Sequence, residues 1–177
     1  RIDRNTGGIV IAAKNAETLR ILNEKIRDHE IEKSYLCITV GRPNPPQGKI
    51  EGFLLKDEAK KQVSFHRRPV PGGKTAVTLY KTLETRGPLS LVECRLLTGR
   101  THQIRVSMAQ IGCPLLGDGK YGNGAVNRSY HETRQALYSY KLAFTFPTDA
   151  GILSYLRGRE FTVEAVPFRE KYFPIHL

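Results

Sequence analysis

The sequence predicts a single α+β domain in which a mixed, mostly antiparallel sheet is flanked by helices and loops. Between residues 32 and 97, segments rich in β-branched and aromatic residues follow one another, with glycine and proline residues between them, as in an antiparallel sheet. Apolar residues at helical spacing occur in residues 15–27 and 101–111. No internal repeat or linker interrupts the 177 residues, so we expect one domain over residues 1–177.

The first third of the chain predicts a strand, a helix and a second strand. Residues 8–13 form an apolar run after paired glycines, which indicates a short buried strand that follows a tight turn. Asn15 is a typical helix N-cap, and the predicted helix continues to about residue 27. Its apolar stripe consists of Leu19, Leu22 and Ile26. Residues 32–40 predict the second strand, which ends at a glycine and a proline cluster.

The middle of the chain predicts three further strands and a polar segment. Residues 49–55 predict one strand, and residues 74–85 and 90–97 predict an antiparallel pair. The basic residues 56–73 between them are expected to form a solvated edge or loop, or to follow a phosphate backbone, with equal weight on the two interpretations.

The last part of the chain predicts a helix, a surface loop and two late strands. Ile104, Met108 and Ile111 lie at helical spacing, which predicts a helix over about residues 101–111 that ends before Gly112 and Pro114. The polar residues 123–134 are expected to form a surface loop. Residues 137–146 and 160–166 are expected to form late strands.

The charge of the chain predicts a polyanionic partner. Its 28 Lys and Arg residues against 17 Asp and Glu residues give a formal net charge of +11 and a pI near 9.8. Such a charge on a small domain makes nucleic acid the leading candidate, although many basic proteins have no functional nucleic-acid ligand.

The cysteines and glycines do not indicate a cofactor site. Cys37, Cys94 and Cys113 are far apart and lack zinc-ligand spacing, which fits reduced thiols in a cytoplasmic protein. The glycine-rich residues 117–122 lack the pattern of a nucleotide-binding loop. From these two patterns we expect no metal and no organic cofactor. Because the sequence has no apolar run of about 20 residues, we also expect no membrane span. We also expect a cytoplasmic monomer.

The first residues of the chain contain the leading candidate for catalysis. Asp3 lies between Arg1 and Arg4, just before Gly7 and Gly8. Nearby cations favour an ionised carboxylate, so Asp3 suits a nucleophile or an electrostatic anchor better than a general acid. A terminal turn with solvated charges is the alternative.

Three motifs resemble those of the RluA family of RNA pseudouridine synthases. Residues 1–8, Arg-Ile-Asp-Arg-Asn-Thr-Gly-Gly, resemble the family's His-Arg-Leu-Asp-Arg-x-Thr-Ser-Gly signature. Residues 33–41 resemble its Lys-x-Tyr segment, and residues 100–106 resemble its Arg-Thr-His-Gln-Ile-Arg-Val motif. Gly7 replaces the usual Ser, and Ser107 stands where the family often has His. Because the leading His is missing, we expect that an upstream part of the parent protein is absent.

The resemblance implies a pseudouridine-synthase-like catalytic domain that isomerises uridine in RNA. It assigns Asp3 as the catalytic residue, Tyr35 as the residue that stacks on the base and takes part in proton abstraction, and Arg105 as the partner of Asp3. A guanidinium can hold a carboxylate through two charge-assisted hydrogen bonds. The RNA-binding candidates are Arg1, Arg4, Arg100 and His102.

Three functions are therefore compared. The first is an isomerase that acts on RNA, with large-subunit ribosomal RNA as the expected substrate. The second is a non-catalytic RNA-binding or ribosome-assembly domain, which the intact catalytic motifs disfavour. The third is a nuclease, which is weaker because the sequence shows neither a carboxylate cluster for two metal ions nor an obvious pair of histidines.

Overall fold

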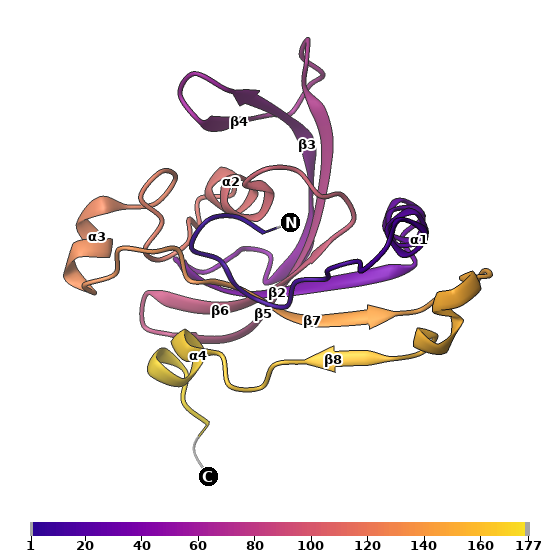
Figure 1. The fold of residues 1–177 in the computed structure, drawn as a ribbon. Helices are drawn as coiled ribbons and strands as arrows, with labels where there is room; N and C mark the ends of the chain where they lie inside the picture. The colour runs from indigo at the N-terminus through magenta and orange to yellow at the C-terminus, as the bar shows by residue number, and fades with distance from the viewer. Residues whose placement is uncertain (1, 176–177) are drawn as a thin grey trace.

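A computed structural model, which describes residues 2–175, shows one mixed sheet of eight strands with helices around it (Figure 1). Along the sheet the strand order is β1-β7-β2-β6-β5-β3-β4, and β8 pairs with β7. The strands are β1 (Gly7–Gly8), β2 (Ile31–Val40), β3 (Gln47–Asp57), β4 (Gln62–His66), β5 (Lys74–Arg86), β6 (Leu89–Leu96), β7 (Leu137–Phe144) and β8 (Glu160–Thr162). Every pairing except that of β1 with β7 is antiparallel, which confirms the predicted fold class.

Short helices surround the sheet. They are α1 (Ala16–Arg27), α2 (Gln103–Gln110), α3 (Gly124–Ser129), the 3-10 helix η1 (Gly151–Leu156) and α4 (Pro167–Tyr172). The predictions missed η1 and α4, and they also missed α3, which lies inside the expected surface loop 123–134. None of the helices within residues 2–175 has the length and apolarity needed to cross a membrane.

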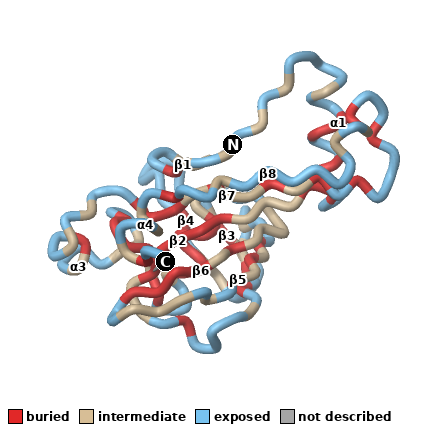
Figure 2. Tube along the Cα trace, turned by 90° about the horizontal axis from the view of Figure 1, so that it is seen from below, coloured by how far each residue is buried: buried red, intermediate tan, exposed pale blue. Residues whose placement is uncertain are grey.

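The core lies on both faces of the central strands. Figure 2 shows buried residues concentrated along β2 and β6, with exposed segments around them. β2 is paired with β6 on one side and β7 on the other, and most of its residues from Tyr35 to Thr39 belong to apolar clusters. A strand that is covered on both faces reads as a nearly continuous apolar run, which is why β2 was predictable.

The helix α1 has the predicted N-cap but buries a different face from the one predicted. The Asn15 side chain accepts a hydrogen bond of 2.8 Å from the Thr18 amide. The buried side chains are Ile21, Leu22 and Lys25, whereas Leu19 is 52% exposed, so its predicted place in the core stripe was wrong. The Lys25 ammonium can be buried because it forms an ion pair of 2.7 Å with Glu30. A charged residue therefore lies on the buried face of α1, which the spacing of apolar residues does not predict.

The strand predicted at residues 8–13 is limited to β1. Gly7 and Gly8 pair in parallel with Tyr138 and Ser139 of β7. Gly8 has a φ of 108°, and a Cβ atom there would lie 2.1 Å from the Ser139 carbonyl oxygen. Only glycine permits this approach. The Ile9 amide makes one more bond, 2.8 Å long, to the same oxygen. Residues 9–13 then continue outside the sheet, where Ile9, Ile11 and Ala13 contact the core beside it and Val10 is exposed.

A hairpin replaces part of the predicted loop 56–73. Strand β4 pairs with β3, and the two strands extend above α2 in Figure 1. Val63 of β4, near the β3–β4 turn, is buried with Val106 of α2, so the hairpin packs on the helix that carries the third motif. The alternation of apolar Val63 and Phe65 with polar neighbours was the available signal for this strand.

Two of the three residues in the predicted stripe of α2 are in the core. Ile104 and Met108 pack with Tyr35 and other residues of β2 and β6, whereas Ile111, just after the helix, is 36% exposed. The helix is therefore held on the sheet by its first two turns, next to Tyr35.

Replacing Met108 with Ala should lower the free energy of unfolding by about 2–5 kcal/mol, because it leaves a cavity under α2. Ile111→Ala, at the exposed third position, should change it by less than about 0.5 kcal/mol. Urea unfolding followed by circular dichroism measures both. Equal losses in the two variants would show that the helix packs differently.

Candidate active site

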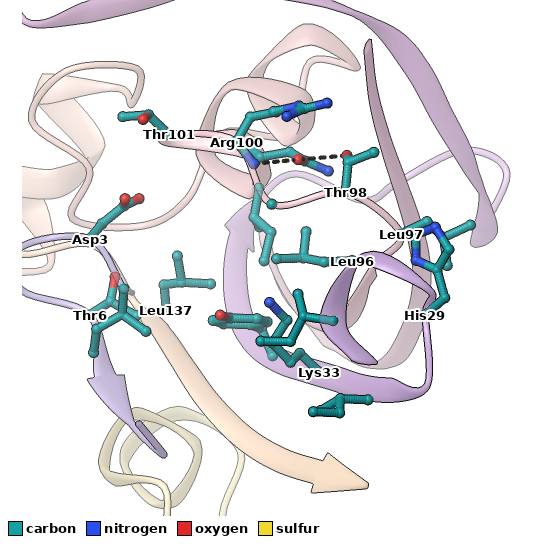
Figure 3. A pocket seen from close by; sticks show the side chains of 17 residues that line it. Asp3, Thr6, His29, Lys33, Leu96, Leu97, Thr98, Arg100, Thr101 and Leu137 are labelled. Carbon is teal, nitrogen blue, oxygen red and sulfur yellow. Dashed lines mark hydrogen bonds between the residues drawn. The ribbon is translucent and has the colours of Figure 1, made fainter. Parts of the chain in front are cut away.

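A cavity of about 340 Å³ lies where the first residues of the chain meet β2, the end of β6 and the loop before α2 (Figure 3). Asp3, Tyr35 and Arg100, three of the residues predicted for the site, line it. Its other walls combine polar side chains with apolar ones, and Leu96, Leu97, Ile104 and Leu137 are among the apolar ones. The structure thus brings residues from all three motifs to one cavity.

The turn that carries Asp3 is anchored to the fold by backbone and side-chain bonds. The Thr6 amide donates a 3.0 Å hydrogen bond to the Asp3 carbonyl oxygen. The buried Gln135 amide group donates to the Arg4 carbonyl oxygen at 2.6 Å and to the Thr6 hydroxyl at 3.3 Å. The Asp3 side chain is 18% exposed. Its carboxylate is therefore held at the cavity wall while remaining reachable from outside.

Tyr35 is presented to the cavity from the centre of the sheet. Burial raises the pKa of its phenol, and the charge of Asp3 raises it further, which outweighs the opposing effect of a hydrogen bond with Ser139. The phenol is therefore neutral at physiological pH. A flat, largely apolar ring at this position suits stacking against a planar base.

Arg105 is buried in α2 and contacts two carboxylates. Its Nη1 lies 3.9 Å from Asp3 Oδ2, an ion pair without a close hydrogen bond. Its two short hydrogen bonds go to Asp118 instead, with Nε to Oδ2 at 2.7 Å and Nη2 to Oδ1 at 2.9 Å. Arg105 therefore pairs with Asp3, but the expected two-bond fork onto that residue was wrong.

The prediction missed Asp118, whose side chain is fully buried. Its Oδ1 also accepts hydrogen bonds from the amides of Lys120 and Tyr121, at 2.9 and 3.1 Å. Burial raises the pKa of Asp118, but the hydrogen bonds and charge of Arg105, together with these amides, lower it by more. The only signal in the sequence was one acidic residue between glycines, which also fits an ordinary turn.

Tyr121 encloses the other side of Arg105. The Arg105 Cζ atom lies 5.1 Å from the centre of the Tyr121 ring, in a cation–π arrangement. The Tyr121 hydroxyl oxygen accepts a 2.9 Å bond from the Val63 amide of β4 and lies 2.7 Å from His102 Nδ1. One residue therefore connects the β3–β4 hairpin, His102 and the buried guanidinium.

His102 occupies a structural position between the cavity loop and α2. It is the N-cap of α2, with a φ of 55°. Burial lowers the pKa of its imidazole, and the charge of Arg105 lowers it further. Nδ1 of the ring shares a hydrogen bond of 2.7 Å with the Tyr121 hydroxyl, whose direction depends on the tautomer of the ring. His102 does not line the cavity, so contact with RNA remains a prediction for this residue.

Gln103 is a second residue that the sequence reasoning missed. Its buried side-chain oxygen accepts bonds from the Thr98 hydroxyl and the Arg100 amide, at 2.8 and 3.0 Å. Its side-chain nitrogen donates to the Val77 carbonyl and the Thr78 hydroxyl of β5, both at 3.0 Å. The amide therefore ties the loop 98–101, which forms a cavity wall, to the sheet.

The remaining RNA-binding candidates differ in position. Arg100 is exposed at the rim of the cavity, where its Nε donates to the Thr75 carbonyl oxygen at 2.9 Å. Arg4 is exposed and does not line the cavity. Arg1 lies outside the described residues. Among residues 2–175, no group of three or more His, Cys, Asp or Glu side chains is arranged to hold a metal ion.

Comparison with known proteins identifies the relatives of this chain. A family model described as RNA pseudouridylate synthase matches residues 1–110. Ribosomal large subunit pseudouridine synthase D of Borreliella burgdorferi is 39% identical over 145 residues, which are 80% of this chain and 42% of that protein. The chloroplastic RNA pseudouridine synthase 2 of Arabidopsis thaliana is 35% identical over 182 residues, with 88% and 42% covered. The chain thus spans less than half the length of these relatives.

A solved structure shows the same fold. Human RNA Pseudouridylate Synthase Domain Containing 1 has a TM-score of 0.74 at 23% identity, and the match covers 92% of this chain and 66% of that one.

Replacing Asp118 with Asn should destabilise the protein by about 3–5 kcal/mol, because an amide cannot balance the buried charge of Arg105. The exposed ion pair of Asp28 and Arg27 provides the control, since Asp28→Asn should cost at most about 1 kcal/mol. Chemical denaturation at neutral pH measures both losses. Similar small losses would mean that Asp118 does not hold Arg105 in solution.

The same pair predicts a dependence of stability on pH. Because the folded pKa of Asp118 is lowered, its contribution is complete above the unfolded value of about 3.9 and is lost as the pH falls through the folded pKa. The stability difference between the wild type and Asp118→Asn should therefore shrink below about pH 4. Denaturation curves between neutral and acidic pH check this, and a constant difference would contradict it.

Proposed function

The chain belongs to the RNA pseudouridylate synthase family, and from this premise we propose that it isomerises uridine in RNA to pseudouridine. The observation that supports this proposal most directly is the position of the Asp3 carboxylate and the Tyr35 ring in one cavity, with Arg105 paired to Asp3 behind it. An ionised carboxylate, a flat ring and a space for a detached base are the groups that the reaction requires.

The reaction breaks the bond between C1′ of the ribose and N1 of uracil, and the electron pair leaves with the base. The base then rotates, C5 bonds to C1′, C5 loses its proton and N1 gains one, so the atoms balance without a redox step. Asp3 either attacks C1′, and is released when C5 bonds to C1′, or removes the proton from C2′ in a glycal route and returns it to C2′ as C5 bonds to C1′. Both roles use the Asp3 carboxylate, whose partner is the Arg105 guanidinium.

Tyr35 and the pocket walls are proposed to hold the base during its rotation. A ring that is neutral and buried retains the base by stacking while allowing it to turn in its own plane. The apolar walls at Leu96, Ile104 and Leu137 exclude water from the reacting carbon. Arg100, at the rim of the cavity, and Arg4, exposed on the Asp3 turn, are proposed to bind the RNA backbone.

The proposed substrate is large-subunit ribosomal RNA. The net charge of +11 supports a polyanionic substrate, and several relatives are named as ribosomal large subunit pseudouridine synthases. A uridine in structured RNA must leave its stack to reach the cavity. We further propose a cytoplasmic monomer that folds as one catalytic domain, in line with the three free, buried cysteines.

Asp3→Asn should abolish the release of tritium from ribosomal RNA labelled at uracil C5, because the neutral amide neither attacks C1′ nor accepts a proton. RNA binding, measured by filter retention, should change by less than about threefold, since one polar group of similar size replaces another. Asp28→Asn, an exposed carboxylate outside the cavity, serves as the activity control. The assay is run on this chain and on the protein with its natural flanking sequence.

Tritium release that persists in Asp3→Asn would contradict the assignment of Asp3. Binding of RNA without any release by the unaltered protein, with or without its flanking sequence, would favour the non-catalytic RNA-binding alternative.

A further inference from the structure

Lys33 lines the cavity but has no role in the reaction as assigned to Asp3, Tyr35 and Arg105. It is two residues before Tyr35 on β2, so both side chains are on the same face of the strand. Ile31, Lys33 and Tyr35 all line the cavity, as this alternation requires. Figure 3 shows the Lys33 amine directed among the cavity side chains, on the side away from Thr101.

Within residues 2–175 the Lys33 side chain forms no hydrogen bond or ion pair, although the Asp3 carboxylate lines the same cavity. By contrast Glu32, the preceding residue of β2, is paired with Arg95. The buried Lys25, by comparison, is bonded to Glu30. Burial lowers the pKa of the Lys33 ammonium. A desolvated and unpaired cation costs free energy, so its position calls for a negative charge that arises there.

The proposed reaction supplies such a charge. When the bond between N1 and C1′ breaks, uracil holds the electron pair as an anion that is spread over N1 and the two carbonyl oxygens. A cation that faces this base binds the departing anion more strongly than the neutral nucleotide. Only an interaction that strengthens in this way accelerates the chemical step.

We propose that Lys33 is a catalytic residue that donates a hydrogen bond to a carbonyl oxygen of the target uracil and stabilises the uracil anion after its bond to ribose breaks. Lys33 keeps its proton throughout, so it adds no proton-transfer step. Asp3 acts at the ribose, Tyr35 holds the ring, and Lys33 acts at the edge of the base. This inference rests on the proposed function and adds a residue for the leaving base.

The test is Lys33→Met, which keeps the length of the side chain and removes its charge. The single-turnover rate of isomerisation at saturating RNA should fall about 100-fold, as when one donor of a preorganised site is removed. RNA affinity should change by less than about threefold. Lys33→Arg should recover part of the rate, because it restores a cationic donor. Lys81→Met, an exposed lysine of β5 outside the cavity, should leave the rate unchanged.

A second measurement separates the chemical role from a structural one. Fluorine at C5 makes the uracil anion less basic, so its departure needs less help from Lys33. The rate loss in Lys33→Met should therefore be several-fold smaller for the consumption of 5-fluorouridine RNA than for uridine RNA. Thermal unfolding should show no loss of stability, because the Lys33 side chain makes no hydrogen bond or ion pair with the other residues of 2–175.

Three outcomes would overturn the inference. One is an unchanged rate in Lys33→Met while the unaltered protein is active. The second is a loss confined to RNA affinity and its salt dependence, which would make Lys33 a phosphate contact. The third is the same loss for both bases, which indicates a disturbed cavity. Failure of the proposed function itself differs from all three, because the unaltered protein would then show no isomerisation.

Discussion

The rest of the site depends on the interaction of the Arg105 guanidinium with two carboxylates, Asp118 and Asp3. A buried charge must be balanced, and Asp118 balances this one through two short hydrogen bonds. With Nε and Nη2 engaged, Nη1 remains to face Asp3 at 3.9 Å. The guanidinium orientation is therefore set from the side away from the cavity. Within residues 2–175 the Asp3 carboxylate thus faces a cation while no short side-chain hydrogen bond occupies it, which leaves its oxygens free to react.

The fold brings these groups together from distant parts of the sequence. The close approach at Gly8 fixes the Asp3 turn on β7, and Gln135 holds the same turn from its other side. β2 then places Tyr35 and Lys33 on one face, beside the ion pair. The loop 98–101 completes the cavity because Gln103 binds it to β5. The Asp3 turn and the loop 98–101 are thus both anchored to the sheet at the cavity.

The sequence predicted the parts of this fold in which burial follows a regular period. The strands β2, β5 and β6 and the Asn15 cap are local patterns, and the three motifs placed Asp3, Tyr35 and Arg100 at one cavity. The failures are tertiary. Apolar residues 9–13 pack beside the sheet without joining it, Lys25 is buried because Glu30 pairs with it, and Asp118 meets Arg105 only after the chain returns to α2. Residue type and spacing along the chain do not predict such tertiary contacts.

The central claim is that the cavity bordered by Asp3, Tyr35 and Lys33 receives a uridine from RNA. A crystal structure of Asp3→Asn bound to a stem-loop of large-subunit ribosomal RNA that the unaltered protein modifies tests it most directly. The account predicts one uridine turned out of its stack, with the base against Tyr35, C1′ next to residue 3 and a carbonyl oxygen within hydrogen-bonding distance of Lys33. A base bound elsewhere on the protein, or a cavity that remains empty while the RNA stays fully stacked, would contradict it.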